Sequence, residues 1–148
     1  MAKSSFKLAI VGSRVMTLAQ AKEARDLIDR LIDEYMPNVV VSGGAFGVDK
    51  IAADCARRKG IEVDEKLPAD LNWPAYRARN ILIAETCDTC IAIKTPQSVT
   101  GGTSFTMQYA RTVLKKPVRL ITLKGPRRED PRVTDDFWSD VPKEVLSA

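Results

Sequence analysis

Five short apolar runs alternate with helix-forming stretches along this chain of 148 residues. The runs occupy residues 6–11, 39–41, 61–66, 90–94 and 117–123. Apart from the mixed run 61–66, they are mainly apolar rather than regularly alternating with polar residues, which is typical of parallel strands buried on both faces. Parallel strands need crossover connections, and the stretches between these runs are long enough to be helices. The pattern predicts an α/β fold with a doubly wound parallel sheet of about five strands in the order 3-2-1-4-5 and helices on both faces.

Capping and helix-breaking residues mark where these helices begin and end. Thr17 is placed to cap a helix over residues 18–36, and Pro37 ends it. Gly60 is suited to the left-handed position after a second helix, and Pro74 to the first turn of a third helix that runs to Thr86. A fourth helix is predicted over residues 103–115. Residues 1–124 therefore form one domain, and the charged, proline-rich residues 125–148 form an extension packed on it or trailing from it.

Composition narrows the location and the partners of the protein. No apolar run approaches the roughly 20 residues of a membrane span, and the N-terminus lacks the features of a signal peptide, so a cytoplasmic protein without a membrane partner is expected. The net charge of +4 and the pI of about 9.0 are compatible with an anionic partner. Apolar positions Met107, Tyr109 and Val113 on the fourth predicted helix are compatible with a homodimer.

The residue inventory limits the chemistry that the chain can perform. It has no histidine, which removes the usual general base and the commonest metal ligand. Cys87 and Cys90 form a CxxC pair, but without a second ligand pair or a helix beginning at the motif we interpret them as buried thiols. We therefore expect no metal site, no catalytic residue and no required cofactor.

Three segments follow strands at the edge where a doubly wound sheet binds its ligands. The first follows strand one, at the point where the strand order reverses. The second and third are rich in glycine and lead into helices, where backbone N–H groups and the helix dipole favour an anion. The candidate ligand-binding residues in these segments are Gly12, Ser13, Arg14, Ser42, Gly43, Gly44, Ala45, Gly47, Val48, Asp49, Gly101, Gly102, Thr103, Ser104 and Thr106.

The loop SGGAFG at 42–47 is by itself equally well explained as a tight turn or as an anion site. Neither the dinucleotide motif GxGxxG nor the phosphate-loop motif GxxxxGK[ST] is present. The second loop, TGGTSFT at 100–106, repeats the glycine pair and adds hydroxyl groups. Together the two loops favour a ligand that carries phosphate.

The ordered series VGSR, VSGGAFGVDKIAADCA, LPAD, RNILIAETCDTCIAI and GGTSFTMQYARTVLKKPV resembles the SLOG superfamily over residues 6–123. This Rossmann-like group includes the DNA-processing protein DprA/Smf, the LOG proteins and small YpsA/YspA-type proteins, and the last of these resemble the chain most. The resemblance implies binding of a nucleotide or nucleotide-derived ligand at the glycine loops.

The resemblance also assigns roles to individual residues. Arg79 and Asn80 match the family's RN pair, which implies that Arg79 binds phosphate or ribose and that Asn80 binds the ligand or braces the glycine loop. LOG enzymes, which hydrolyse nucleotide N-glycosides, carry a catalytic glutamate where this chain has Thr106, so LOG-type hydrolysis is disfavoured. Asp49 lies at the start of a helix and is explained equally well as a helix-start residue or as a ligand of ribose hydroxyls.

The sequence thus predicts non-catalytic binding of a small, nucleotide-like molecule. A LOG-like phosphoribohydrolase, with Asp49 or Glu85 as acid or base, is the enzymatic alternative. DprA-like binding of single-stranded DNA is a further alternative, although only 6% of the residues are aromatic and no basic stripe with interleaved aromatics is visible. A molybdenum-cofactor carrier is the remotest alternative.

Overall fold

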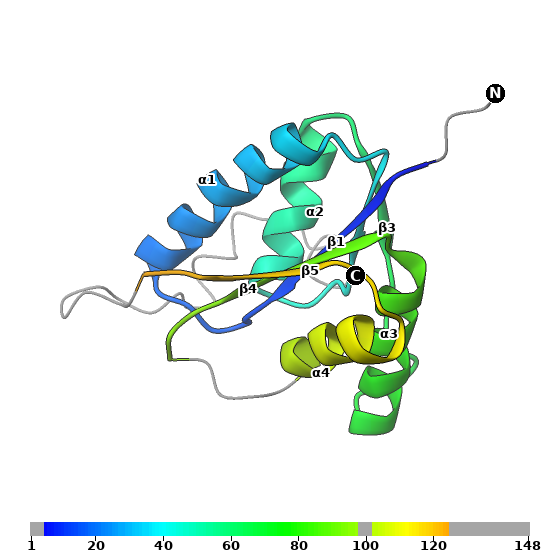
Figure 1. The fold of residues 1–148 in the computed structure, drawn as a ribbon. Coiled ribbons are helices and arrows are strands. Elements are labelled where there is room, and N and C mark those ends of the chain that lie inside the picture. The colour runs from blue at the N-terminus through cyan, green and yellow to red at the C-terminus, as the bar shows by residue number, and fades with distance from the viewer. Residues whose placement is uncertain (1–4, 98–101, 125–148) are drawn as a thin grey trace.

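The computed structural model describes residues 5–97 and 102–124, which form a five-stranded parallel sheet with helices on both faces (Figure 1). The strands are β1 (Lys7–Gly12), β2 (Val39–Ser42), β3 (Glu62–Glu65), β4 (Thr89–Lys94) and β5 (Val118–Thr122). Their order is β3-β2-β1-β4-β5, as predicted from the sequence. Gly101 and the extension 125–148 lie outside the described residues, so the predictions made for them stay predictions.

The helices divide into two pairs, one on each face of the sheet (Figure 1). Helices α1 (Leu18–Tyr35) and α2 (Val48–Arg58) cover one face. Helices α3 (Trp73–Thr86) and α4 (Gly102–Gln108) cover the other, and α4 continues into a π-helical turn over Tyr109–Val113. Among the described residues, no helix is long and apolar enough to cross a membrane.

The central strand β1 explains how one sheet supports two cores. Leu8 and Ile10 point into the core beneath α1 and α2, whereas Ala9 and Val11 point into the core beneath α3 and α4. All four side chains are buried because successive residues of a strand face opposite sides. Edge strands β3 and β5 are less buried than the three central strands.

Capping side chains fix the starts and ends of the helices, among them the predicted cap Thr17. Thr17 and Gln20 form a reciprocal capping box at the start of α1, and Asn72 accepts a hydrogen bond from the Ala75 N–H at the start of α3. At the end of α3, the Lys116 ammonium donates to three carbonyl oxygens, those of Ala84, Glu85 and Cys87. This cation satisfies backbone acceptors that the helix itself leaves unpaired.

The structure differs from the sequence prediction at the fourth helix. Its α-helical part ends at Gln108 rather than at residue 115, and the chain continues in a π-turn in which the Leu114 N–H donates to the carbonyl of Tyr109. Met107, which we considered for a dimer surface, is buried in the core, whereas Val113 is exposed. A dimer through this helix therefore loses one of the apolar positions on which it was predicted.

The reversal of strand order lies between β1 and β4, which pair in parallel from Leu8 with Thr89 to Gly12 with Ile93. Just beyond these strands, the Ser13 N–H donates to the Ile93 carbonyl, and the Thr95 N–H donates to the Ser13 hydroxyl. The helix that follows β1, α1, covers one face of the sheet, whereas the helix that follows β4, α4, covers the other (Figure 1). This divergence opens the crevice in which doubly wound sheets bind ligands.

Candidate ligand-binding site

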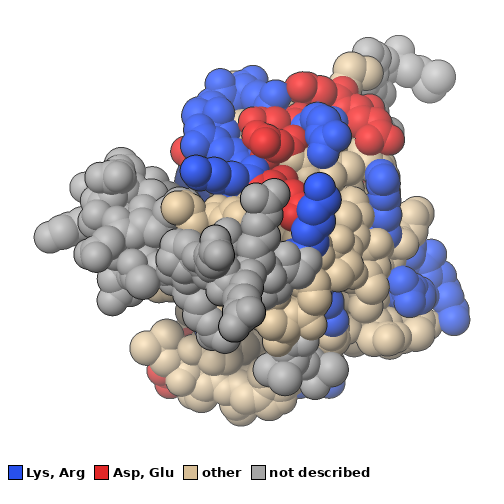
Figure 2. Space-filling view, turned by 90° about the vertical axis from the view of Figure 1, so that its left-hand side faces the viewer, with Lys and Arg blue, Asp and Glu red and all other residues tan. Residues whose placement is uncertain are grey.

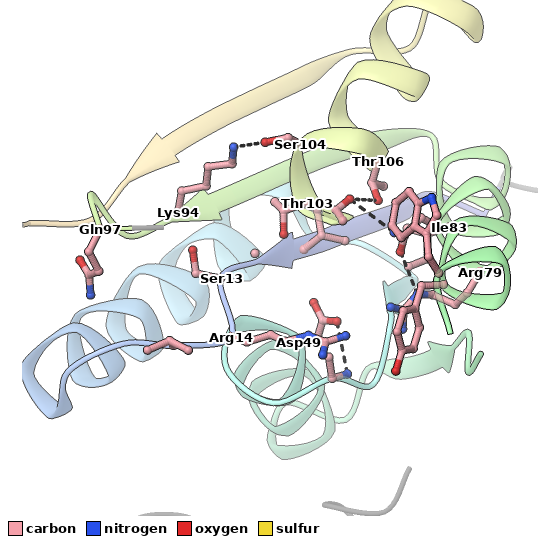
Figure 3. Close-up of a pocket in the computed structure, with 18 residues that line it drawn as sticks. Ser13, Arg14, Asp49, Arg79, Ile83, Lys94, Gln97, Thr103, Ser104 and Thr106 are labelled. Carbon is pink, nitrogen blue, oxygen red and sulfur yellow. Dashed lines mark hydrogen bonds between the residues drawn. The ribbon is translucent and has the colours of Figure 1, made fainter. Parts of the chain in front are cut away.

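A cavity of about 550 Å³ lies at this crevice, at the carboxyl ends of β1 and β4 (Figure 3). Its walls come from the loop after β1, the start of α2, the inner face of α3, the end of β4 and the start of α4. The lining residues are Val11, Gly12, Ser13, Arg14, Val15, Ala45, Asp49, Trp73, Tyr76, Arg79, Asn80, Ile83, Lys94, Gln97, Gly102, Thr103, Ser104 and Thr106.

The face of the molecule seen in Figure 2 is not uniformly charged. In this view, basic and acidic side chains are intermixed in the upper part of the face. The ion pairs Lys59–Asp33 and Arg58–Asp29 join the C-terminal halves of α1 and α2, away from the carboxyl ends of the strands. The cationic side chains of the cavity belong to a different set: Arg14, Arg79 and Lys94. Asp49 supplies the one carboxyl group among the described lining residues. The cavity is therefore biased toward an anion.

Several backbone N–H groups in and just after the first glycine loop, residues 42–47, form hydrogen bonds within the protein. The Gly44 N–H donates to the Ser42 hydroxyl, the Ala45 N–H donates to Oδ2 of Asp49, and the Val48 N–H donates to the Ser13 carbonyl. These groups were predicted to hold phosphate. In the structure they fix the loop against the strand-one loop and the start of α2, and the binding of phosphate by this loop stays a prediction.

The glycines in this loop permit close contact between backbone segments. Gly47 has a φ of +85°, and a Cβ atom there would lie 2.2 Å from the Ser13 carbonyl oxygen. A Cβ atom on Gly43 would lie 2.7 Å from Oδ2 of Asp49 and 2.9 Å from Nη1 of Arg79. The cluster of three glycines is thus explained by the packing of protein groups around the cavity, before any ligand is considered.

The predicted site residues consequently separate into two groups. Most lie in the cavity wall: Gly12, Ser13, Arg14, Ala45, Asp49, Arg79, Asn80, Gly102, Thr103, Ser104 and Thr106. Ser42, Gly43, Gly44, Gly47 and Val48 lie outside the lining, in the layer that supports it. Gly101 lies outside the described residues.

Arg79 and Asn80 connect the two glycine loops. Arg79 is buried, and it donates through Nη1 to the Gly43 carbonyl at 2.6 Å and through Nε to Oδ1 of Asn80 at 2.8 Å. Asn80 in turn donates to the Gly102 carbonyl at 3.4 Å. Burial lowers the pKa of the Arg79 guanidinium, and the nearby Asp49 opposes that shift. The pair therefore braces both loops, while the guanidinium contributes positive charge to the cavity wall.

Asp49 stands on the cavity floor with an incomplete set of hydrogen bonds (Figure 3). Its side chain is 7% exposed; Oδ2 accepts the Ala45 N–H at 3.3 Å, and Oδ1 has no partner. Burial raises the pKa of this carboxyl to about 6, although Arg79, the Ala45 N–H, Arg14 and Lys50 all act to lower it. An ionised Asp49 is thus costly to the protein and is able to accept a further hydrogen bond.

Lys94 and Arg14 place positive charge on opposite walls of the cavity. Lys94 ends β4, and its ammonium donates to the Ser104 hydroxyl on α4 (Figure 3). Arg14 is exposed, and its guanidinium carbon lies 5.5 Å from the centroid of the Tyr76 ring. The hydroxyls of Ser13, Thr103 and Ser104 also line the cavity, so both walls offer groups that bind phosphate oxygens.

Sequence reasoning missed seven lining residues: Val11, Val15, Trp73, Tyr76, Ile83, Lys94 and Gln97. The signals for several of them were present. Tyr76 and Ile83 lie three or four residues from Arg79 and Asn80 on the same helix, so they share its inner face. Lys94 is the last residue of a strand at the ligand-binding edge. Gln97 was harder to predict from the sequence, because its side-chain amide forms two reciprocal hydrogen bonds with that of Gln20, which lies far away in the sequence on α1.

An aromatic cluster adjoins the cavity mouth. Trp73, which is 49% exposed, meets Phe105 edge-on at 5.7 Å, and Phe105 stacks on Tyr109 at 5.9 Å. The Arg77 guanidinium lies over Phe105 at 5.4 Å. Three aromatic rings and one guanidinium group from α3, α4 and the π-turn therefore lie together, an arrangement that their separation in the sequence conceals.

Two elements considered for catalysis or metal binding are otherwise engaged. The Thr106 hydroxyl donates to the Gly102 carbonyl at 2.8 Å within its own helix. The three cysteines are buried and free, as predicted, and burial raises the pKa values of Cys55 and Cys90 to about 12. Within residues 5–97 and 102–124, no group of three or more histidine, cysteine, aspartate or glutamate residues is placed to hold a metal ion.

Comparisons with known proteins agree with this architecture. A family model for DNA recombination-mediator protein A matches residues 1–72. The molybdenum cofactor binding protein from Rippkaea orientalis has a similar fold, with a TM-score of 0.64 and 19% identity over 82% of this chain and 78% of that one. The structural-genomics target TM1055 gives a TM-score of 0.57 and 21% identity over 76% and 72% of the two chains.

DNA processing protein A (DprA) from Streptococcus pneumoniae is also similar, with a TM-score of 0.50 and 20% identity over 79% of this chain. The match spans only 58% of the length of that DprA chain. No curated protein has a significant sequence match to the chain. The family-model match covers just under half of the chain, and the three solved structures share its fold. Both findings agree with the resemblance to the SLOG superfamily that the ordered motifs indicate.

Proposed function

We propose that this protein binds a nucleotide or a nucleotide-derived molecule in the cavity and releases it unchanged. The observation that carries the proposal is the composition of the cavity wall, which combines three cationic side chains, several hydroxyls and two aromatic rings. A volume of about 550 Å³ falls within the roughly 300–1,000 Å³ typical of small-molecule sites.

Phosphate is best accommodated between β4 and α4. Lys94 supplies a point charge there, and Thr103 and Ser104 lie in the first turn of α4. Lysine and hydroxyl groups are common ligands of phosphate oxygens, and a phosphate would replace Ser104 as the acceptor of the Lys94 proton. The second glycine loop, rather than the first, is therefore proposed as the phosphate side of the site.

A base is best accommodated against α3. Trp73 and Tyr76 contribute flat surfaces to the wall, and Ile83 lies further along the same helix. Stacking of a base on an aromatic side chain contributes about 1–3 kcal/mol. The apolar and aromatic wall therefore lies on the side of the cavity away from Lys94.

Binding without hydrolysis is proposed because the wall offers no matched pair of acid and base. Thr106 occupies the position of the LOG glutamate, and its hydroxyl proton is held by Gly102. Asp49 could supply or accept one proton, but among the described lining residues no second carboxyl group could activate water. General acid–base help typically contributes about 10²- to 10⁴-fold to such reactions.

Calorimetric titration with adenosine monophosphate tests the proposal, preceded by native mass spectrometry to detect a retained molecule. We expect saturable binding in wild type and a loss of about tenfold or more in Lys94→Met, because charge-assisted hydrogen bonds contribute about 1.5–3 kcal/mol. Lys115→Met is the matched control, since Lys115 is exposed and lies outside the cavity lining. Equal affinity in Lys94→Met and wild type would contradict the site.

Single-stranded DNA binding is a second candidate, supported by the aromatic cluster at the cavity mouth and by the family-model match. Neighbouring aromatic rings with a guanidinium group beside them suit the stacking of bases. Fluorescence anisotropy with a labelled oligothymidine separates the candidates. If DNA is the physiological ligand, Phe105→Ala should weaken DNA binding and leave mononucleotide binding intact, because Phe105 does not line the cavity.

A further inference from the structure

Two buried side-chain oxygens of the described residues have no hydrogen-bond partner, and one of them belongs to the cavity. This atom is Oδ1 of Asp49. An unsatisfied buried acceptor costs about 1–3 kcal/mol, and more when it is charged. Because Asp49 lines the ligand cavity, a hydrogen-bond donor on the ligand could satisfy this oxygen.

The protein holds the Asp49 carboxyl group so that it cannot readily find another partner of its own. Oδ2 accepts from the Ala45 N–H, and the Asp49 backbone carbonyl accepts from the buried Ser42 hydroxyl. The nearby Arg79 guanidinium is committed to Gly43 and Asn80. The backbone of Gly43 packs against the same carboxyl group, since a Cβ atom there would lie 2.7 Å from Oδ2.

The carboxyl group requires a ligand that donates hydrogen bonds, since an ionised carboxylate only accepts them. Oδ1 exposes less than 1 Å² of surface, so a donor reaches it when a neighbouring side chain moves. Arg14 is the exposed neighbour: it lines the same cavity, and its charge acts on Asp49. Its guanidinium carbon lies 5.5 Å from the centroid of the Tyr76 ring, and the residue is exposed to solvent.

The position of Asp49 identifies which part of a nucleotide would meet it. Figure 3 shows Asp49 below the Lys94–Ser104 pair and to the left of Arg79 and Ile83 of α3. A nucleotide with its phosphate at Lys94 and its base against α3 would pass its sugar along the wall that holds this carboxyl group. In a nucleotide, ribose separates phosphate from base, and its two adjacent hydroxyls match a carboxylate.

We propose that Asp49 recognises the adjacent 2′- and 3′-hydroxyl groups of a ribonucleotide and thereby discriminates against deoxynucleotides. The inference rests on the proposed function and deepens it, because it names ribose as the sugar of the ligand. A site built to hydrogen-bond a hydroxyl rejects an analogue without it, since a buried polar group is then left unpaired. Recognition requires the negative charge and the geometry of Asp49 together.

Titration calorimetry with adenosine monophosphate and its 2′-deoxy and 3′-deoxy analogues tests this inference. In wild type we expect each deoxy analogue to bind about tenfold or more weakly than the ribonucleotide. In Asp49→Asn, the affinity for the ribonucleotide should fall toward that of the analogues, so the ratio between them approaches one. Asp26→Asn, which changes an exposed carboxyl group on α1, should retain the wild-type ratio.

The outcomes separate this inference from the proposed function. If the ribonucleotide and both analogues bind wild type equally well, ribose recognition is wrong and nucleotide binding stands. If wild-type discrimination persists unchanged in Asp49→Asn, another group reads the hydroxyls and the assignment to Asp49 is overturned. If none of the three nucleotides binds, the proposed function and this inference both fail. Circular dichroism under the conditions of the calorimetric titrations confirms that the variants are folded.

Discussion

Replacing Asp49 with asparagine should make the protein more stable at neutral pH, even though the change removes a proposed ligand group. The side chain is buried, and the burial raises the pKa of its carboxyl from 3.8 to about 6. Asparagine keeps nearly the same shape, and its amide oxygen can still accept the Ala45 N–H. The substitution therefore removes a buried charge while preserving the hydrogen bond that the loop uses.

The size and sign of the effect follow from the difference between the two pKa values. Because the folded state binds the proton more tightly than the unfolded state, the stability of wild type falls as pH rises from about 4 to about 6. Each pKa unit corresponds to about 1.36 kcal/mol, so the ionised group costs on the order of 3 kcal/mol above pH 6. Below about pH 4 the carboxyl is protonated in both states, and this cost disappears.

Urea denaturation of wild type and Asp49→Asn, followed by circular dichroism between pH 4 and pH 8, measures this difference. We expect the variant to be more stable by up to about 3 kcal/mol at pH 7–8 and the two curves to converge near pH 4. Asp26→Asn serves as the exposed control and should show no such dependence. A stability difference that is constant across this pH range would refute the argument, because it would not arise from a titrating group at position 49.

Three further substitutions test the roles assigned to a glycine, a lysine and a cysteine. Gly47→Ala should lower the free energy of unfolding, measured by urea denaturation, by several kcal/mol, because the new Cβ would lie 2.2 Å from the Ser13 carbonyl oxygen. Gly60→Ala is the control: it has a similar φ of +73° but open space around the new Cβ, so it should lower the same free energy by only about 1 kcal/mol. Lys116→Met should cost about 1–3 kcal/mol by the same assay through its three lost carbonyl contacts, and exposed Lys115→Met should cost little. Cys87→Ser should leave metal content unchanged by mass spectrometry, and stoichiometric zinc that disappears in the variant would contradict the interpretation of this thiol as a buried core group.

The fold was predictable because it depends on patterns that are local in the sequence. The uninterrupted apolar runs of the central strands and the caps at Thr17 and Pro74 each act within a few residues. The strand order followed from the general topology of alternating strands and helices. The π-turn after Gln108 was not predictable, since a helical apolar pattern continues through it.

The general position of the candidate site was also predictable, but the contacts that individual residues make there were not. Glycine at position 47 signals close approach without saying whether the neighbour is a ligand or, as the structure shows, the backbone of Ser13. Arg79 carried the right charge, yet its hydrogen bonds go to Gly43 and Asn80, residues placed beside it by the fold. The aromatic wall was missed because Trp73 and Phe105 are brought together by the packing of α3 against α4.

The chemistry of the cavity separates what the fold needs from what a ligand needs. The fold needs an acceptor at position 49 for the Ala45 N–H, and a neutral amide would supply one at a lower cost than a buried carboxylate. It also needs Arg79 as a brace, but Lys94 meets only a hydroxyl that water could replace. An anionic group on the floor and a lightly engaged cation on the wall are therefore expensive or dispensable for folding. Both groups gain a role when a molecule with hydroxyl donors in its middle and negative charge at one end occupies the cavity. This is the physical basis on which we propose a ribonucleotide as the ligand.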